Sequence, residues 1–284
     1  MGSLTMIGTG LNPPDDLTIR GIRACQAADV VFLESYTSAC PQPIQAFSEA
    51  IGTRIITLTR REIEQEDRII TEASERDVAF LVLGDPLSAT THIELFTRAR
   101  SQGIRTAIIH NTSILTAVAT TGLELYKFGK TTSLAYPRRG FFPKTAYHTA
   151  SENQKIHAHT LILLDIVTGS ETAHIDVSRG NLSDMHRTYT TIREGLDKQP
   201  LLMMSPNEAF ALLREIEKDE KLGLFTEETE MIVCSRLGTD EQICAGPLRT
   251  LTTRAYDQGP HALILPSTLH FVEDEALAAY RVKS

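Results

Sequence analysis

The stretch Val78–His92, with the sequence VAFLVLGDPLSATTH, most strongly constrains how this 284-residue chain can fold. Its first six residues, Val78–Leu83, are apolar, and such a run is typical of a strand buried on both faces of a parallel sheet. Gly84, Asp85 and Pro86 end the strand, and small or hydroxyl residues follow. Because ligands of open α/β sheets bind beyond the carboxyl ends of strands, this is a candidate binding loop. The same residue types also form ordinary turns.

Strand and helix patterns alternate on both sides of this loop. Short apolar runs predict further strands at Leu4–Gly8, Val30–Ser35, Arg54–Leu58 and Arg105–His110. Helical spacing predicts a helix capped by Thr18, an exposed charged helix over Glu62–Ser74, and a helix over Thr91–Gln102 that ends at Gly103. This alternation predicts a parallel sheet within about the first 110 residues.

The second half of the chain has a different pattern. Strands are predicted at Thr131–Pro137, His159–Ile166, Glu230–Gly238 and Pro260–Pro266, with longer connections between them. Ser205, Pro206 and Glu208 predict the start of a helix, with a capping box between the serine and the glutamate. The change of pattern near residues 111 to 130 predicts two domains, residues 1–112 and residues 113–284.

Composition excludes several classes of protein. The net charge is −8 and basic residues are not clustered, so we expect neither a nucleic-acid partner nor a membrane surface. No apolar run reaches the roughly 18 residues that cross a bilayer, and the N-terminus lacks the pattern of a signal peptide. The four cysteines form no C-x-x-C pair, and we expect them to be reduced, as in a cytoplasmic protein.

The motif IGTG places Gly8 and Gly10 directly after a strand, which suggests a dinucleotide-binding G-x-G-x-x-G loop with Glu34 as the ribose ligand. However, Pro13 occupies the third glycine position and Pro14 follows it. The two prolines delay the helix, so no helix N-terminus is expected to meet a pyrophosphate. A loop that holds a different ligand with backbone atoms remains open.

Other catalytic motifs are missing or weak. His157 and His159 lack the companions of a metal site, so we expect surface or capping histidines and no metal. The sequence contains no G-x-S-x-G elbow, no S-x-x-K and no P-loop lysine motif. Asn111, Thr112 and Ser113 lie at a strand-to-helix junction, where they are either helix caps or the polar edge of a ligand site.

Several strings of residues nevertheless occur in the order known from one enzyme family. They are IGTGL, LTIRG, VVFLESYTS, GDPLSATTH, IHNTSI, ENQK with HTLILLDI, SRLG, and GPHALIL with LHFVEDEAL. Through them the chain, from Leu4 to Leu277, resembles the diphthine synthases, which belong to the tetrapyrrole-methylase-like (class III) superfamily of S-adenosylmethionine-dependent methyltransferases. The strings ESYTS and GDP-x-SATTH are specific to the diphthine synthases, whereas I-G-x-G and G-D-P occur across the superfamily.

The resemblance implies a two-domain α/β fold, with a parallel-sheet N-terminal domain, a mixed-sheet C-terminal domain and the cofactor cleft between them. It also implies a homodimer that uses S-adenosyl-L-methionine and releases S-adenosyl-L-homocysteine. No side chain is assigned as a catalytic base. Carried over residue by residue, the implied cofactor contacts are Leu11, Asp85, Ser88, Ser113, Ile114, Leu164, Leu237 and His261.

The implied substrate is translation elongation factor 2, whose modified-histidine intermediate is methylated repeatedly in diphthamide biosynthesis. Archaeal-type members add three methyl groups and eukaryotic-type members also esterify the carboxylate; the charged segment Arg60–Arg68, together with the length of the chain, favours the eukaryotic type. Two alternatives remain, a superfamily methyltransferase acting on a tetrapyrrole or RNA, and a non-catalytic cofactor-binding scaffold. The chain departs from the family pattern at Thr9, Ser88, His157–Ala158 and Pro200–Ser205.

Overall fold

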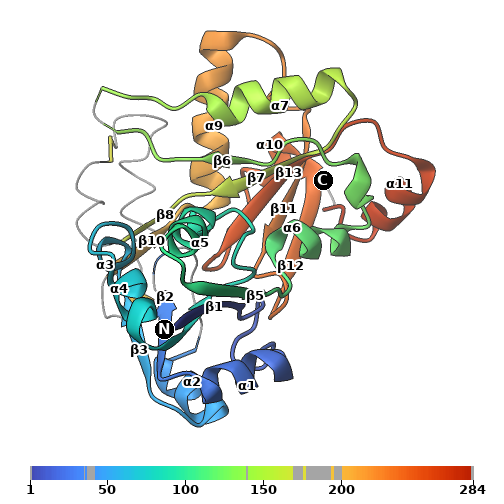
Figure 1. Cartoon of the computed structure of the whole chain (residues 1–284). Helices are drawn as coiled ribbons and strands as arrows, with labels where there is room; N and C mark the ends of the chain where they lie inside the picture. Colours follow the sequence, from blue (N-terminus) through green and yellow to red (C-terminus); the bar gives the residue numbers. More distant parts are fainter. Residues whose placement is uncertain are drawn as a thin grey trace. The chain divides into compact units, whose positions relative to one another are not determined.

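The computed structural model describes residues 2–34, 36, 42–138, 140–168, 175–176, 193–194 and 200–282. The chain through Ala117 forms the body of one compact unit, and most of the chain from Val118 onward forms a second, called unit 1 and unit 2 below (Figure 1). The boundary predicted after Thr112 lies a few residues before this division. Part of the ESYTS string and Cys40 lie outside the described residues.

Unit 1 contains the predicted parallel sheet. Its strands are β1 (Ser3–Gly8), β2 (Val30–Glu34), β3 (Ile55–Leu58), β4 (Asp77–Val82) and β5 (Arg105–Ile109). They lie in the order β3-β2-β4-β1-β5, and every neighbouring pair is parallel. The predicted β4 therefore lies at the centre of the sheet, next to β1.

The side chains of β4 alternate between two apolar layers. Val78, Phe80 and Val82 pack with helices α4 (Arg68–Glu75) and α5 (His92–Ser101). Ala79 and Leu81 point to the opposite face, where α1 (Ile19–Ala27) and α2 (Ile44–Ile51) cover the sheet (Figure 1). Because both faces are buried, this strand needs an unbroken apolar run.

One helix prediction for unit 1 is confirmed and another is wrong. The Thr18 cap is confirmed, since its hydroxyl accepts a hydrogen bond from the Gly21 N–H at 3.0 Å. The single helix predicted over Glu62–Ser74 is wrong, because the segment forms α3 (Arg60–Glu64) and α4. Asp67, between them, has a left-handed backbone with φ of 51°, which interrupts the helical ladder. The short α6 (Ile114–Ala117) ends the main segment of the unit.

Unit 2 is built on a mixed five-stranded sheet. Its strands, in spatial order, are β12 (Gln242–Pro247), β11 (Glu230–Ser235), β13 (His261–Leu265), β7 (Thr160–Leu164) and β6 (Thr132–Leu134). The β6–β7 pair is parallel and the other pairs are antiparallel. A smaller sheet contains β8 (Ile166–Thr168), β10 (Pro200–Met203) and β9 (Arg193–Glu194). The α/β class predicted for both halves is thus confirmed.

Helices cover the mixed sheet and connect its strands. Unit 2 contains η1 (Val118–Thr121), η2 (Leu125–Lys127), α7 (Thr145–Lys155), α9 (Pro206–Glu220), α10 (Leu248–Leu251) and α11 (Phe271–Ala278). Helix α7 packs on β6 and β7, and α9 packs on β13 (Figure 1). The predicted capping box of α9 is confirmed: Ser205 Oγ accepts from the Glu208 N–H, and Glu208 Oε2 accepts from the Ser205 N–H at 2.8 Å.

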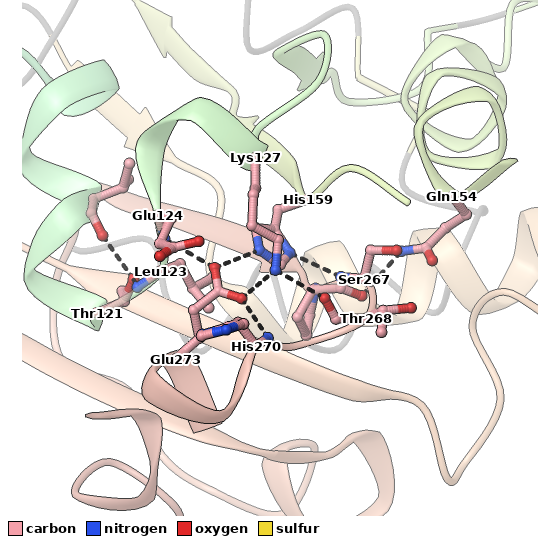
Figure 2. A network of polar contacts seen from close by, with 12 residues as sticks. Thr121, Leu123, Glu124, Lys127, Gln154, His159, Ser267, Thr268, His270 and Glu273 are labelled. Atoms are coloured by element: carbon pink, nitrogen blue, oxygen red, sulfur yellow. Dashed lines mark hydrogen bonds and ion pairs between the residues drawn. The ribbon is translucent and has the colours of Figure 1, made fainter. Parts of the chain in front are cut away.

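A buried carboxylate links η2, the residue before β7 and the start of α11 (Figure 2). Glu273 is fully buried, and its Oε1 accepts hydrogen bonds from the Glu124 N–H at 2.9 Å and from His159 Nε2 at 3.0 Å. Its Oε2 accepts from the His270 N–H at 2.8 Å and from the Lys127 ammonium. Burial alone would raise the pKa of Glu273, but these donors outweigh it and lower the pKa to about 2.

His159 corrects one expectation from the sequence. It is fully buried rather than at the surface, because its ring joins two chain segments inside unit 2. Its Nδ1 accepts from the Ser267 N–H at 2.9 Å, so Nε2 carries the proton that is donated to Glu273 (Figure 2). Burial lowers the pKa of this imidazole, which keeps it neutral. His157 is exposed, as expected.

We predict that Glu273→Gln destabilises the protein in a pH-dependent way. A carboxyl whose pKa is lower in the folded state stabilises the fold above its ordinary pKa and loses this contribution as the pH falls. At neutral pH the free energy of unfolding of the variant should be lower by a few kcal/mol, because each tenfold preference for the charged carboxyl is worth about 1.4 kcal/mol. This deficit should shrink as the pH falls from 4.5 towards about 2. Denaturant unfolding at several pH values measures it.

The matched control is Glu152→Gln, which removes the exposed carboxylate that pairs with Lys130 at 3.0 Å. An exposed ion pair of this kind contributes between zero and about 1 kcal/mol, so the control should differ little from the parent at any pH. A Glu273→Gln deficit that stays the same from neutral to acidic pH would contradict the assigned role.

Candidate functional site

The candidate site of unit 1 is the carboxyl edge of three neighbouring strands, β4, β1 and β5. The loops after β1 and β4 are joined through their backbones: the Gly10 N–H donates to the Gly84 carbonyl at 3.1 Å, and the Gly84 N–H donates to the Gly10 carbonyl at 3.0 Å. Both glycines have φ near +75° (76° and 74°), which other residues rarely adopt. The glycines of both motifs therefore bring two loops within backbone contact.

Asp85 anchors the predicted binding loop. Its Oδ1 accepts from the Leu87 N–H at 3.0 Å and from the Ser88 hydroxyl at 3.3 Å. Its Oδ2 accepts from His110 Nδ1 at 2.8 Å and from the Asn111 N–H at 3.1 Å. Burial would raise the pKa of Asp85, but the donors lower it below its ordinary value, so the carboxylate is charged. It links the β4 loop to the segment that follows β5.

Asn111 links the same segment to the loop after β1. Its side-chain N–H groups donate to the carbonyls of Gly8 at 3.0 Å and Asp16 at 2.9 Å. The Asp16 carboxylate in turn accepts from the N–H groups of Leu11 and Asn12 at 3.0 and 2.8 Å. The loops that follow the three strands thus form one hydrogen-bonded assembly.

The structure brings the five implied contact residues of unit 1 to this edge. Leu11 follows β1, Asp85 and Ser88 follow β4, and Ser113 and Ile114 follow β5. Leu11, Ser88 and Ile114 are partly exposed, while Asp85 and Ser113 are buried. Their contacts with a cofactor stay a prediction.

The three implied contact residues of unit 2 lie at one edge of its sheet. Leu164 ends β7, His261 begins the antiparallel β13, and Leu237 follows β11 shortly after Ser235, which pairs with His261. His261 Nδ1 lies 2.8 Å from Ser235 Oγ. Burial, together with the nearby charge of Arg236, lowers the pKa of His261 to about 4, so its imidazole is neutral at physiological pH.

The dinucleotide hypothesis is also excluded by Glu34. This residue is fully buried, and its Oε1 accepts from the Leu83 N–H at 3.0 Å while Oε2 lies 3.3 Å from His92 Nε2. The Tyr36 hydroxyl lies 3.4 Å from the same His92 nitrogen. Glu34 is therefore engaged inside unit 1, and the strings ESYTS and GDPLSATTH meet through these three side chains.

The sequence patterns did not mark His110 as a residue of the candidate site. Its side chain is 66% exposed, yet its Nδ1 is held by the buried Asp85 carboxylate. The signal available in the sequence was a histidine placed directly between the apolar run of β5 and Asn111.

Two further findings concern the described residues as a set. Within them, no three His, Cys, Asp or Glu side chains are grouped so that they could hold a metal ion. None of their helices is both long enough and apolar enough to cross a membrane. The cysteines among the described residues are free thiols, namely Cys25, Cys234 and Cys244.

Comparison with known proteins identifies the class. Residues 3–252 match the family described as Tetrapyrrole (Corrin/Porphyrin) Methylases, and the chain therefore belongs to this family of methyltransferases. Similar proteins within the family include diphthine synthases. The chain is 32% identical to the diphthine synthase of Methanocaldococcus jannaschii, over 96% of this chain and 97% of the relative. It is 35% identical to the human diphthine methyl ester synthase, over 98% and 95% of the two chains.

Solved structures agree with the sequence relatives. A crystal structure assigned to a diphthine synthase of Entamoeba histolytica matches with a TM-score of 0.83 and 29% identity, over 100% of both chains. A second diphthine synthase structure matches with a TM-score of 0.78 and 28% identity, over 98% of this chain and 95% of that chain. The protein is an S-adenosylmethionine-dependent methyltransferase of the diphthine synthase group.

Proposed function

We propose that this protein methylates the modified-histidine intermediate on translation elongation factor 2 in diphthamide biosynthesis. The observation that carries the proposal is similarity over nearly the whole chain to diphthine synthases of archaea and human. The alternatives, a methyltransferase for a tetrapyrrole or RNA and a non-catalytic scaffold, lack a comparable observation. The net charge of −8 also argues against an RNA substrate.

We further propose that the eight implied residues contact S-adenosyl-L-methionine. The residues of unit 1 fit this cofactor by their chemistry. Leu11 and Ile114 offer partly exposed apolar surface for the adenine, and the Ser88 and Ser113 hydroxyls offer partners for polar groups. The charged Asp85 carboxylate favours a cation nearby. In unit 2, the largely buried Leu164, Leu237 and neutral His261 supply apolar groups and one polar group.

When bound, the cofactor supplies a methyl group that is attached to a positively charged sulfur. The substrate amine attacks the methyl carbon in line with the carbon–sulfur bond and displaces the sulfur. Such a displacement depends on holding the two reactants close and collinear, so positioning carries much of the rate. Apolar walls such as Leu164 and Leu237 favour the neutral, nucleophilic form of an amine, since desolvation lowers the pKa of a cationic group. Hydrogen-bonded loops such as the one anchored by Asp85 keep the contact residues in place.

The number of methyl groups depends on whether the protein acts like its archaeal or its eukaryotic relatives. The archaeal relatives are named diphthine synthases, and the human and Arabidopsis relatives are named methyl ester synthases, with identities between 32% and 35%. The charged segment Arg60–Arg68, which contains α3, favours the eukaryotic type. We also propose a homodimer in the cytoplasm; three free cysteines are consistent with a reducing compartment.

We predict that Asp85→Ala weakens binding of S-adenosylmethionine at least about tenfold, or about 1.4 kcal/mol. The alanine removes the acceptor of four hydrogen bonds that hold the loops after β4 and β5. Isothermal titration calorimetry measures the dissociation constant directly. The matched control is Asp77→Asn, at the amino end of the same strand, which should leave the affinity unchanged. Unchanged affinity in Asp85→Ala would contradict the assignment of Asp85.

The decisive test of the proposed function is intact-mass spectrometry of elongation factor 2 that carries the unmethylated intermediate, incubated with this protein and S-adenosylmethionine. We expect stepwise gains of one methyl group each, localised to the modified histidine. Three steps indicate the archaeal pattern, and a fourth that is lost on mild alkaline ester hydrolysis indicates the eukaryotic pattern. Cofactor binding without any gain of mass would refute the proposal and favour another substrate or a scaffold.

The dimer is tested separately by light scattering at micromolar concentration. We expect twice the mass of the chain, and a monomeric mass would count against this part of the proposal.

A further inference from the structure

We infer that His110 is a catalytic residue that accepts the proton which the substrate amine loses before it attacks the methyl group. The inference rests on the proposed function, because it assumes an amine substrate that arrives as an ammonium. It adds a residue and a chemical step that the similarity to relatives does not assign.

The first observation is the geometry of the His110–Asp85 pair. His110 Nδ1 donates to Asp85 Oδ2 at 2.8 Å, which fixes the tautomer with the free lone pair on Nε2. A buried carboxylate that holds a histidine in this way orients the imidazole and stabilises its cationic form, as in the Ser-His-Asp triads of hydrolases. Asp85 itself accepts hydrogen bonds from the N–H groups of Leu87 and Asn111, which fix the position of the pair.

The second observation is the exposure of the imidazole. Its side chain is 66% exposed, although its partner is buried. No described residue forms a hydrogen bond with His110 Nε2. The nitrogen that would take up a proton is therefore accessible to a substrate from outside unit 1.

The third observation is position. His110 follows directly after β5, at the carboxyl edge of the parallel sheet, where ligands of such sheets bind. Two of the proposed cofactor contacts lie nearby. The Ser88 hydroxyl donates to the same Asp85 carboxylate, and Ser113 is three positions after His110 in the chain. The exposed base and those contacts thus belong to one set of loops.

The charged groups around His110 are consistent with this role. Among the residues that the structure describes, Asp85 is the ionisable residue that contacts the His110 imidazole. Asp16, on the loop after β1, has its carboxylate occupied by the Leu11 and Asn12 N–H groups. Helix α5 packs on β5, but none of its ionisable side chains forms a described ion pair or hydrogen bond with His110.

Other groups are less suited to the role. Burial lowers the pKa of both His92 and His261 to about 4, and their ring nitrogens face Glu34 and Ser235, respectively. Asp85 has a lowered pKa and four donors on its two oxygens, which leaves it a poor proton acceptor.

The step balances as follows. The substrate ammonium transfers one proton to His110 Nε2, and the resulting amine lone pair forms the bond to the methyl carbon. The carbon–sulfur bond breaks, and its electron pair stays on the sulfur, which becomes the neutral thioether of S-adenosylhomocysteine. The imidazolium then returns its proton to solvent before the next methyl transfer.

The test compares His110→Asn with the parent protein. The Asn side chain can still donate to Asp85 but has no nitrogen that takes up a proton at neutral pH. We expect the affinity for S-adenosylmethionine to stay within about twofold by calorimetry, while the rate of the first methylation falls about 100-fold or more near neutral pH. The deficit should shrink as the pH rises, because the substrate amine then loses its proton to solvent.

The matched control is His157→Asn, an exposed histidine of unit 2 whose backbone φ of 57° asparagine tolerates well. It should behave as the parent does. His110→Ala supplies a second readout, since added imidazole should restore part of its activity in proportion to the neutral imidazole concentration.

Each outcome decides between the hypotheses. A His110→Asn rate close to that of the parent, or a deficit that is the same at every pH, would overturn the role of His110 while leaving the proposed function intact. A matching loss of cofactor affinity would show that His110 only positions the loops, and would likewise overturn it. Failure of the parent protein to transfer any methyl group would overturn the proposed function and this inference together.

Discussion

The buried Asp85 carboxylate is the interaction on which the candidate site depends. A charged group in a low-polarity environment is costly unless donors surround it, and here four donors from two separate loops do so. The solvation of one charge thus forces the loops after β4 and β5 into a single arrangement. Asn111 extends the arrangement to the loop after β1 through two backbone carbonyls.

Unit 2 follows the same principle at another place. The fully buried Glu273 accepts hydrogen bonds from η2, from His159 just before β7 and from the start of α11, and the neutral His159 also accepts a hydrogen bond from Ser267 (Figure 2). This network is structural, because the Glu273 carboxylate is fully buried and both of its oxygens accept hydrogen bonds from donors of the same unit. The pair of Asp85 and His110 differs, since one of its two members reaches solvent.

This difference has consequences for methyl transfer. A sulfonium is already activated, so the reaction asks the protein mainly for fixed geometry and for a neutral nucleophile. Hydrogen-bonded loops at the carboxyl edge of a parallel sheet provide the fixed geometry. An exposed imidazole held by a buried carboxylate provides a route to the neutral nucleophile without a metal ion or a covalent intermediate.

Local patterns along the chain predicted the α/β class, the buried strand β4 and the caps of α1 and α9, and the order of the motifs indicated the enzyme family. These features follow from local rules: apolar runs, capping residues and glycines that take positive φ act over a few neighbouring residues. The eight cofactor contacts were implied by the resemblance alone, and their contact with a ligand stays a prediction. The break between α3 and α4 at Asp67 was missed, because a left-handed residue leaves little trace in an amphipathic pattern.

Only the tertiary structure decided the pairings between distant residues. Asp85 and His110, Glu34 and His92, and His159 and Glu273 are separated by 25 to 114 positions along the chain. Asp85 meets His110 because the strand order places β4, β1 and β5 side by side, and Glu34 meets His92 because β2 lies next to β4. His159 meets Glu273 because the start of α11 lies against the residue that precedes β7. A histidine or a carboxylate has the same letter in the sequence whether it is buried or exposed. Its charge, tautomer and role are set by the partners that the fold brings to it.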